Sequence, residues 1–406
     1  MALSAPRPKI LVFLGRYLPG FRSGGPVRTI SCMVEALAPH FDFYILTLNR
    51  DSGSHEVYTS VRTGAWNRVG AAHVYYTPDF RFSVLRGAID EVRPDALYLN
   101  GFFSRSSLRG LVLRRVGGLP SELPIVLATR GDLAPGALGL KATKKRVFTI
   151  LARAVGLYGG LHWHASSERE KSEMLRQLGS FGVRAEHVQV ASDLGVVCPA
   201  VYRQRSPKLA GEASFVTVSR VARMKNLPFT LDRLAELRGR VTLDVFGPLE
   251  DRELWSECER MIEAMPENVS VCYHGELDPG CVFSELAGRQ FFVLPTLGEN
   301  YGHVIIEGAA AGCPVIISDR TQWLGLAEKG IGWDIALHDP LAWRSALQAC
   351  VDMGEPEYRA ISVRAAEFGQ SIMKSTENLR ANLELFNHAV SGRSSVPERV
   401  LRRVET

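Results

Sequence analysis

The chain has 406 residues, of which 46% are hydrophobic and 22% charged, and a formal net charge of +5. This is the balance of an ordinary globular protein, and the length is too great for one compact core, so we expect two domains of about 200 residues each. No apolar run approaches the ~20 residues needed to cross a bilayer, which excludes a transmembrane helix.

The first 15 residues, MALSAPRPKILVFLG, contain a short apolar stretch without a convincing cleavage site. They predict a first buried strand better than a signal peptide.

Short runs rich in Val, Ile, Leu and Phe alternate with helical patterns through the first half of the chain. We expect strands at 9–15, 43–48, 73–78, 96–100, 125–129, 162–166 and 187–191. Helical patterns lie between several of them, at 26–38, 80–93, 105–116, 138–155 and 167–179. Continuous apolar strands separated by helices are typical of a mostly parallel sheet that is covered on both faces.

The second half repeats this pattern, and a polar segment without clear periodicity separates the two halves. Further strands are expected at 214–219, 241–247, 269–275, 291–295 and 314–318. The fold class is therefore α/β, with two doubly wound, Rossmann-like parallel-sheet domains and a cleft between them as the natural ligand site. The expected division is a first domain at 1–198, a linker at 199–213, a second domain at 214–380, and a C-terminal helix and tail at 381–406 that could return to the first domain.

A glycine-containing loop, GRYLPGFRSGGPVRTI (15–30), follows the first expected strand. Gly24 and Gly25 precede Pro26, which is a favoured residue at the start of a helix. Glycines there let the backbone approach a ligand, and a helix N-terminus favours an anion. The spacing does not match G-x-G-x-x-G, so a tight strand-to-helix turn is the alternative.

The segment from Phe103 to Arg153 carries ten basic and two acidic residues, a local excess of eight positive charges in a chain whose total is +5. Its helical part, 138–153, combines cations with a broad apolar face. Such a helix could lie on an anionic membrane surface. The alternative is a solvated cationic face over an ordinary core stripe. Nucleic acid is not expected, because no aromatic platform accompanies the cations.

Two cations stand five residues apart in VSRVARMKN (218–226), just past an expected strand. Arg220 and Lys225 at the carboxyl end of a parallel strand suit a diphosphate, with Arg as a planar fork and Lys as a compact charge. A solvated basic loop is the alternative.

His274 ends a later strand and could contact a base or phosphate. His162 and His164 share one face of an expected strand, and we predict a structural role for them because no third metal ligand is visible.

The stretch GENYGHVIIEG (298–308) places Glu299 in a turn after a buried strand and Glu307 about two turns into an apolar helix. Helical rise over eight residues is ~12 Å, too far for the two carboxylates to share a proton or a metal ion. They could instead hold both ends of an elongated ligand whose negatively charged middle faces the first turn of the helix. A buried, paired glutamate at 307 and a plain loop glutamate at 299 are the alternatives.

Together these motifs resemble retaining GT-B glycosyltransferases of family 4. G-E-N-Y-G-H-V-I-I-E looks like that family's E-x7-E motif, Arg220 and Lys225 match its paired basic residues, and Gly24-Gly25 match its amino-terminal glycine loop. The segments 129–148 and 164–179 are similar to two further family segments. The likeness covers nearly the whole chain in the correct order.

The resemblance implies a nucleoside diphosphate sugar as donor, held mainly by the second domain. It implies that Glu299 bonds donor-sugar hydroxyls, Glu307 the ribose hydroxyls, and Arg220 and Lys225 the diphosphate. The backbone amides of Asn300, Tyr301, Gly302 and His303 would face sugar and phosphate. The family requires no metal or other cofactor, and none is expected here.

Two segments depart from the family pattern. Arg130 occupies the place of a histidine that lies close to the donor sugar in many relatives, and is a candidate catalytic residue for that reason. The sequence ASDLG (191–195) replaces the usual P-N-G-V-D turn, which leaves that hinge contact in doubt.

The expected activity is transfer of a sugar to a hydroxyl of a glycan or lipid-linked glycan, in biosynthesis of cell-surface polysaccharide or glycoconjugates. A nucleotide-sugar epimerase, a phosphorylase of the same fold and a non-catalytic nucleotide-sugar sensor remain alternatives. Scattered cysteines without C-x-x-C pairs, mostly inside apolar patterns, predict reduced core thiols and a cytoplasmic location. The seven are Cys32, Cys198, Cys258, Cys272, Cys281, Cys313 and Cys350. The basic helix at 138–153 is the candidate point of contact with the inner membrane face.

Overall fold

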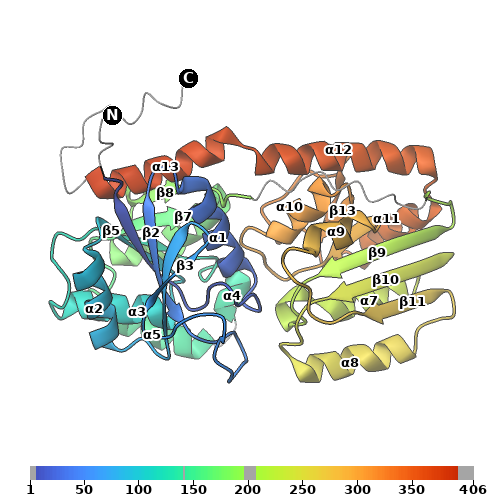
Figure 1. Cartoon of the computed structure of the whole chain (residues 1–406). Coiled ribbons are helices and arrows are strands. Elements are labelled where there is room, and N and C mark those ends of the chain that lie inside the picture. The colour runs from blue at the N-terminus through green and yellow to red at the C-terminus, as the bar shows by residue number, and fades with distance from the viewer. Residues whose placement is uncertain (1–5, 140–141, 196–206, 392–406) are drawn as a thin grey trace, which may run out of the picture. The chain divides into compact units, whose positions relative to one another are not determined.

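A computed structural model describes residues 6–139, 142–195 and 207–391. The chain forms two compact units (Figure 1). The first comprises Met1–Gly20, Ile30–Leu194 and Thr376–Thr406, and the second Phe21–Thr29 and Gly195–Ser375. Most of the predicted linker at 199–213, and Cys198 beside it, lie outside the described residues.

The first unit is built on an eight-stranded sheet with the order β3-β4-β2-β1-β5-β6-β7-β8. Its strands are β1 (Lys9–Phe13), β2 (Asp42–Leu48), β3 (Trp66–Val69), β4 (Ala72–Thr77), β5 (Ala96–Asn100), β6 (Ile125–Ala128), β7 (His162–Ala165) and β8 (Val188–Val190). Every pairing is parallel except that of β3 with β4. Strand β3 was not predicted from the sequence, because WNRV is short and only partly buried.

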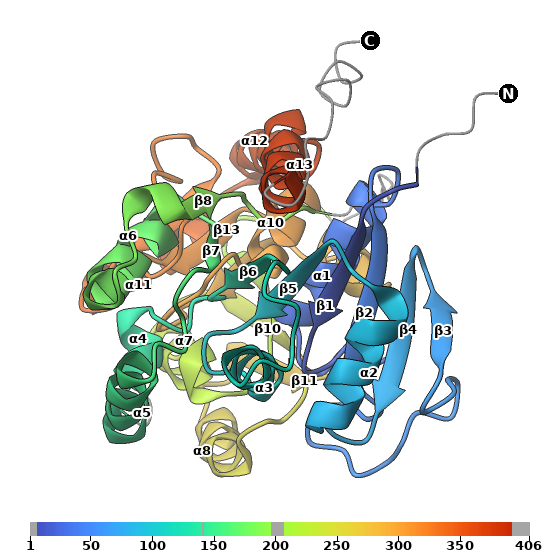
Figure 2. The same ribbon diagram turned by 90° about the vertical axis from the view of Figure 1, so that its left-hand side faces the viewer.

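Helices cover both faces of this sheet (Figure 2). They are α1 (Gly25–Leu37), whose first turn groups with the second unit, α2 (Phe82–Val92), α3 (Arg105–Arg115), α4 (Pro135–Gly139), α5 (Ala142–Ala154), α6 (Glu168–Leu178) and α13 (Thr376–Ser391). The single helix predicted at 138–155 is described as two, α4 and α5. Lys141, one of the cations counted in the basic segment, lies between them and outside the described residues.

Side-chain alternation along the strands divides the core of the first unit between the two faces. Leu97 and Leu99 of β5 share a buried cluster with residues of α2 and α3. Tyr98 between them points the other way, toward Phe386 of α13, with ring centroids 5.2 Å apart. This period of two is the geometry of a strand that is buried on both faces.

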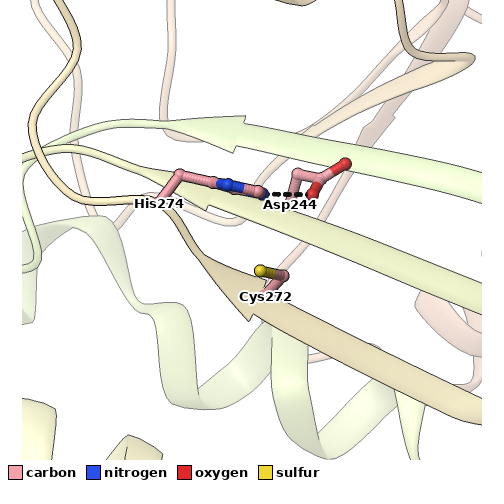
Figure 3. Close-up of side chains that lie close together, drawn as sticks. All are labelled: Asp244, Cys272 and His274. Carbon is pink, nitrogen blue, oxygen red and sulfur yellow. Dashed lines mark hydrogen bonds and ion pairs between the residues drawn. The ribbon is translucent and has the colours of Figure 1, made fainter.

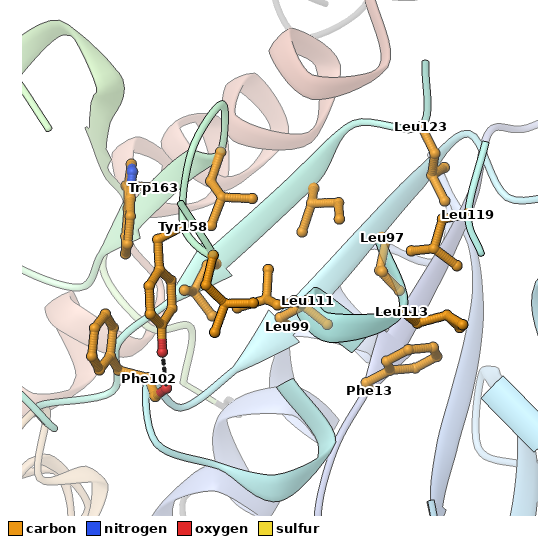
Figure 4. Close-up of a cluster of buried hydrophobic side chains, with 14 of the residues drawn as sticks. Phe13, Leu97, Leu99, Phe102, Leu111, Leu113, Leu119, Leu123, Tyr158 and Trp163 are labelled. Atoms are coloured by element: carbon orange, nitrogen blue, oxygen red, sulfur yellow. Dashed lines mark hydrogen bonds between the residues drawn. The ribbon is translucent and has the colours of Figure 1, made fainter. Parts of the chain in front are cut away.

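One end of the α3-side cluster is closed by aromatic rings (Figure 4). Phe102, just past β5, stacks on Tyr158 with centroids 4.3 Å apart and planes 7° apart. The Tyr158 hydroxyl donates to the Phe102 carbonyl over 2.9 Å, so the phenol is buried with its polar atom satisfied. Trp163 of β7 lies next to both rings.

The second unit contains a six-stranded sheet, in which all pairings are parallel, with the order β11-β10-β9-β12-β13-β14. Its strands are β9 (Glu212–Val218), β10 (Arg240–Phe246), β11 (Val269–Tyr273), β12 (Phe291–Leu294), β13 (Val315–Ser318) and β14 (Gly332–Ile335). Its helices are α7 (Leu227–Leu234), α8 (Arg252–Glu263), α9 (Val282–Ala287), α10 (His303–Ala310), α11 (Pro340–Asp352) and α12 (Glu355–Met373). Strand β14 has four residues and begins with glycine, and it was not predicted from the sequence.

The second sheet is also buried on both faces. Phe215, Val245 and Val293 belong to a cluster with α7, α8 and α11, whereas Val216 and Leu294 belong to a cluster with α10 and α12. Both predicted doubly wound sheets are therefore confirmed. Among the described residues, no helix is both long enough and apolar enough to span a membrane.

The order of the second sheet creates a switch point between β9 and β12. From β9 the chain proceeds outward to β10 and β11, then returns to place β12 on the other side of β9. The loops that leave β9 and β12 therefore run in opposite directions. In open parallel sheets, ligands bind at the carboxyl ends of strands at such a point.

Six cysteines lie in the described part of the chain, and none forms a disulfide there. Cys32, Cys258, Cys313 and Cys350 are buried, as a core role predicts. Cys272 and Cys281 are exposed, so the prediction of buried thiols does not hold for them.

Candidate functional site

The switch point brings together two of the predicted site residues, Lys225 and Glu299. Lys225 ends a 3₁₀ turn (Arg223–Lys225) after β9, and Glu299 lies in the loop after β12. Backbone contacts join the two loops, since the amide of Leu297 donates to the carbonyl of Met224 over 2.8 Å. The Lys225 ammonium forms a hydrogen-bonded ion pair with the Glu299 carboxylate, and both side chains are mostly buried, 15% and 17% exposed.

The helix that follows this loop begins later than the sequence analysis predicted. Gly302 has a left-handed backbone, φ 77° and ψ 57°, and occupies the N-cap position of α10. The helix therefore starts at His303 and Glu307 lies about one turn into it, not two. The predicted 12 Å rise between the carboxylates is wrong for the same reason, because half of the eight-residue interval is loop.

Glu307 is buried, 7% exposed, and has a partner that the sequence analysis did not find. Arg28, in the segment Phe21–Thr29 that groups with the second unit, donates from Nε and Nη2 to Glu307 Oε1 over 3.0 and 2.7 Å. Beside it, the Thr29 hydroxyl lies 2.8 Å from His303 Nε2.

Arg28 lies four residues after Gly24, which has φ 62°. Gly25 is the first residue of α1. A cation following the glycine loop is a signal that the sequence contained.

Arg220 lies at the carboxyl end of β9 and pairs with Glu250 in the loop after β10. The two side chains are 37% and 51% exposed, so water screens this pair more than the other two. The loops are held together by the amide of Val221, which donates to the carbonyl of Pro248 over 2.9 Å.

The second unit thus pairs three cations with three carboxylates: Lys225 with Glu299, Arg28 with Glu307 and Arg220 with Glu250. A diphosphate could compete for such cations, and the carboxylates that it displaced could accept hydrogen bonds from hydroxyl groups. The geometry therefore suits a ligand that carries both phosphates and hydroxyls.

Asn300 and Tyr301 connect Glu299 to the start of α10. The Tyr301 side chain is 3% exposed, and its ring lies against Trp323 with centroids 5.3 Å apart. The Tyr301 carbonyl accepts a hydrogen bond from Trp323 Nε1 over 2.6 Å. These contacts give the ring a packing role and fix the backbone that leads into α10.

His274 belongs to a cluster on the two strands at one edge of the second sheet (Figure 3). Its Nε2 lies 2.5 Å from Asp244 Oδ1, and its ring stacks on Phe246 with centroids 4.6 Å apart. Asp244 and Cys272 are directly opposite each other on β10 and β11. The predicted contact of His274 with a base or phosphate stays a prediction.

The same three residues could each supply one ligand atom to a metal ion, because these atoms lie within 4.8 Å of one another. Arg289 Nε, however, already donates to the second Asp244 oxygen over 2.9 Å. An ion here would have to displace His274 from Asp244 beside a fixed positive charge, which opposes cation binding.

Arg130, the candidate taken from the histidine position, lies in a buried network of the first unit. Its side chain is 8% exposed. Nη1 donates to Asp193 Oδ1 over 2.6 Å, Nε to Asn100 Oδ1 over 3.0 Å and Nη2 to the Tyr98 hydroxyl over 2.7 Å. The predicted catalytic role stays a prediction, and the observed contacts are those of a residue that organises this loop.

The network continues through His164 and Glu170. The His164 ring nitrogens lie 2.7 Å from the Tyr98 hydroxyl and 2.8 Å from the Ala191 carbonyl. The Glu170 carboxylate accepts from the Thr129 and Ser166 hydroxyls and from the amides of Gly131 and Ser166, over 2.6 to 2.8 Å. Burial and the nearby Arg130 charge lower the pKa of His164 to about 4, so the imidazole is neutral at pH 7.

Comparison with solved structures defines the class of fold. Anabaena HepE in complex with UDP and glucose is 16% identical, with a TM-score of 0.66 over 95% of this chain and 100% of that chain. Sucrose-phosphate synthase from Thermosynechococcus elongatus is 16% identical, with a TM-score of 0.70 and the same coverage. WaaG, a glycosyltransferase involved in lipopolysaccharide biosynthesis, is 14% identical, with a TM-score of 0.64 and the same coverage. These similarities show the GT-B type of fold, with two doubly wound parallel-sheet domains.

A family match adds to the fold similarity in the second unit alone. Residues 212–352 match the family described as "Glycosyl transferases group 1". This region contains Lys225, Glu299, Glu307, Arg220 and Glu250. No curated protein matches the chain.

Proposed function

We propose that this protein is a retaining, metal-independent glycosyltransferase of family 4. It transfers a sugar from a nucleoside diphosphate sugar to a hydroxyl of a glycan or lipid-linked glycan. The observation that carries the proposal is the ion pair between Lys225 and Glu299 at the β9/β12 switch point, inside the region that matches group 1 glycosyl transferases.

The three ion pairs of the second unit suggest how the donor is recognised. A diphosphate takes Lys225 and Arg220 as its cations, because phosphate oxygens accept charge-assisted hydrogen bonds as carboxylates do. Glu299 is then released to accept hydrogen bonds from the sugar hydroxyls. Glu307, one turn into α10, accepts hydrogen bonds from the ribose hydroxyls. Arg28 keeps its own hydrogen bonds to Glu307 Oε1.

The start of α10 supports the negatively charged middle of the donor. The first backbone N–H groups of a helix carry partial positive charge and point toward its N-terminus. We assign this role to the backbone from Asn300 to His303, with Gly302 providing the left-handed turn that starts the helix. Gly24 and Gly25 would let a second loop approach the donor, and His274 would contact its base or phosphate.

The reaction needs no protein nucleophile in this proposal. The acceptor hydroxyl attacks the anomeric carbon on the face from which the diphosphate leaves, the bond from that carbon to the diphosphate oxygen breaks, and the hydroxyl proton passes to the departing phosphate. The configuration is therefore retained. Fixed cations and the helix N-terminus stabilise the departing diphosphate, which is an electrostatic role that a metal ion fills in other enzymes. Turnover should therefore persist in EDTA.

Donor choice is the first experimental question. The solved HepE structure contains UDP and glucose, which makes UDP-glucose the first donor to test here. A thermal-shift series with UDP, GDP, ADP and TDP sugars should raise the melting temperature for the matching base only, because a ligand that binds the native state stabilises it.

Substitution of Glu299 tests the site. Glu299→Ala should lower turnover at least 100-fold with an unchanged far-UV spectrum, whereas Glu267→Ala, an exposed glutamate before β11, should change it less than twofold. Normal turnover of Glu299→Ala would remove this residue from the site. Donor binding without turnover in the unmodified protein would favour the sensor alternative, and product with inverted configuration would contradict the retaining mechanism.

The proposed location is cytoplasmic, at the inner face of a membrane. A lipid-linked acceptor would be presented at such a surface, and the basic helix at 138–153 is the proposed point of contact.

A further inference from the structure

The outward face of α5 is apolar, which is the reverse of an ordinary surface helix. Four large aliphatic side chains on or just after this helix are more than half exposed: Val147 at 52%, Ile150 at 60%, Leu151 at 61% and Val155 at 52%. A soluble surface helix normally turns such residues toward the core. Most of the exposed large aliphatic residues of the first unit lie here and in the adjoining α3 segment.

The inner face of α5 is identified by its contacts. Ala152 is 3% exposed, and the Phe148 ring meets Phe103 with centroids 5.7 Å apart. Lys145 also turns inward, since its Nζ donates to the Ala137 carbonyl over 2.6 Å and lies 5.0 Å from the Phe103 ring. At 3.6 residues per turn, Val147 and Ile150 lie on the opposite side of the helix from these residues.

The end of α3 extends this apolar surface. Val116, the C-cap residue of α3, is 71% exposed. Arg115 Nε donates to the Val155 carbonyl over 2.7 Å, which joins the end of α3 to the last turn of α5. We call the set Val147, Ile150, Leu151, Val155 and Val116 the apolar ridge.

Cations lie along one side of the apolar ridge and at its N-terminal end. Around the helix axis, Arg146 and Arg153 lie on the side of Ile150 that faces away from Leu151. Lys144 lies in line with Leu151 and Val155, about two turns before Leu151 along the axis. All three are exposed and form no ion pair with another described residue. The sequence has no acidic residue from Leu133 to Ser167, so nothing in this segment neutralises them.

We propose that the apolar ridge inserts into the interface of an anionic lipid bilayer, with Lys144, Arg146 and Arg153 at the level of the head groups. Apolar residues flanked by cations along one helix face are the arrangement of an interfacial helix that lies in the membrane plane. Cations alone would suit any polyanion, but the exposed aliphatic side chains need an apolar environment as well. The inference deepens the membrane contact of the proposed function, and it does not depend on glycosyl transfer.

Vesicle flotation tests the insertion. The full chain should float with vesicles of phosphatidylcholine and phosphatidylglycerol at 3:1 and bind pure phosphatidylcholine at least tenfold more weakly. The double variant Ile150→Glu/Leu151→Glu should lose at least tenfold in binding to the anionic vesicles. Leu341→Glu, which changes a 72% exposed leucine of α11 in the second unit, is the matched control and should bind as the unmodified chain does.

A second set of variants tests the cations of this surface. Each of Lys144→Gln and Arg153→Gln should weaken binding roughly fivefold, because one cation near an anionic surface contributes about a factor of that size. Added salt should likewise weaken the binding of the unmodified chain to anionic vesicles.

Three results would overturn the proposal. The first is unchanged flotation of the double variant. The second is equal binding to neutral and anionic vesicles. The third is a dimer of the unmodified chain, detected by light scattering, when the double variant is monomeric. That result would make the ridge a protein interface. Glu299→Ala should float normally, so a failed donor site and a failed membrane contact can be told apart.

Discussion

Arg130 and Asp193 form a buried ion pair in the first unit, with Nη1 2.6 Å from Oδ1 and side chains 8% and 3% exposed. These residues belong to the two segments in which the sequence departs from the family pattern that it resembles. The structure shows that the two departures meet: the arginine in the histidine position and the aspartate in the ASDLG turn are partners. The arginine at one position therefore has a charged partner at the other, so the two departures from the family pattern form one interaction.

Removing only one member of this pair should strongly destabilise the folded protein. Arg130→Met leaves the Asp193 carboxylate buried without its cation, and such changes cost about 3–5 kcal/mol of unfolding free energy. The double variant Arg130→Met/Asp193→Leu should be less destabilised than the two single variants predict together. Urea unfolding of all four proteins measures this coupling. The exposed Arg86–Asp90 pair on α2, 3.7 Å apart, is the control, and Arg86→Met should cost less than about 1 kcal/mol. Strict additivity at Arg130 and Asp193 would show that the pair does not stabilise the fold.

Acidification should destabilise the first unit through His164. Burial lowers its pKa to about 4 in the folded protein, against about 6.5 in an unfolded chain. Between these values the unfolded chain binds a proton that the native state does not bind, so stability falls as the pH falls from about 6.5 to about 4. The loss attributable to this group is on the order of 3 kcal/mol.

The control for this pH effect is His164→Gln, which keeps a donor and an acceptor but does not titrate. Melting temperatures of both proteins from pH 7 to pH 4 should diverge, with a shallower decline in the variant. Parallel curves would show that other groups determine the acid sensitivity.

Gly302→Ala should disturb the donor site through the backbone. The residue has φ 77°, which side-chain-bearing residues rarely adopt, and a Cβ would lie 2.8 Å from Ile305 Cδ1 and 3.0 Å from Glu299 Cγ. The strain should cost about 1–2 kcal/mol. Displacement of Glu299 should weaken donor binding in a calorimetric titration. Gly298→Ala, in the same loop, would place its Cβ 3.6 Å from Met224 Sδ, an ordinary contact, and should change affinity much less. Equal effects of the two changes on donor affinity would show that backbone strain at Gly302 is not the cause.

Gly369→Ala should destabilise the second unit. A Cβ at this position of α12 would lie 2.2 Å from the Ala310 amide nitrogen of α10, and backbone cannot move aside as a flexible side chain can. Overpacking of this kind costs about 1–3 kcal/mol. Gly87→Ala, on the exposed face of α2 with open space around it, should instead be neutral or stabilise by up to about 1 kcal/mol. Urea denaturation distinguishes the two. A neutral Gly369→Ala would mean that the α10–α12 contact is looser than described.

The fold class was predictable because hydrophobic periodicity acts locally. Runs such as ILVF and FFVL are apolar on both faces, which only a strand covered on both sides requires. The short strands β3 and β14 were missed because WNRV and GWDI lack that pattern. Their pairing with β4 and β13 depends on neighbours that lie elsewhere in the sequence or follow a turn.

The candidate site was predictable in residue type but not in partnership. The sequence indicated Arg220, Lys225, Glu299 and Glu307 as isolated members of motifs. It gave no sign that Lys225 would pair with Glu299, 74 positions away, or that Arg28 would hold Glu307. It also misplaced the start of α10, because the effect of a left-handed Gly302 depends on backbone dihedrals that the pattern of apolar residues does not encode.

By itself, the sequence determined most of the segments that become strands and helices and the charged residues that lie at their ends, since these follow from side-chain periodicity and local backbone preference. Only the tertiary structure decided which ends meet. Strand order places β12 beside β9, and this brings Lys225 to Glu299. The same long-range packing leaves the outer face of α5 apolar and exposed. Strand order is the sum of many weak contacts between residues far apart in the chain, so no single motif carries it.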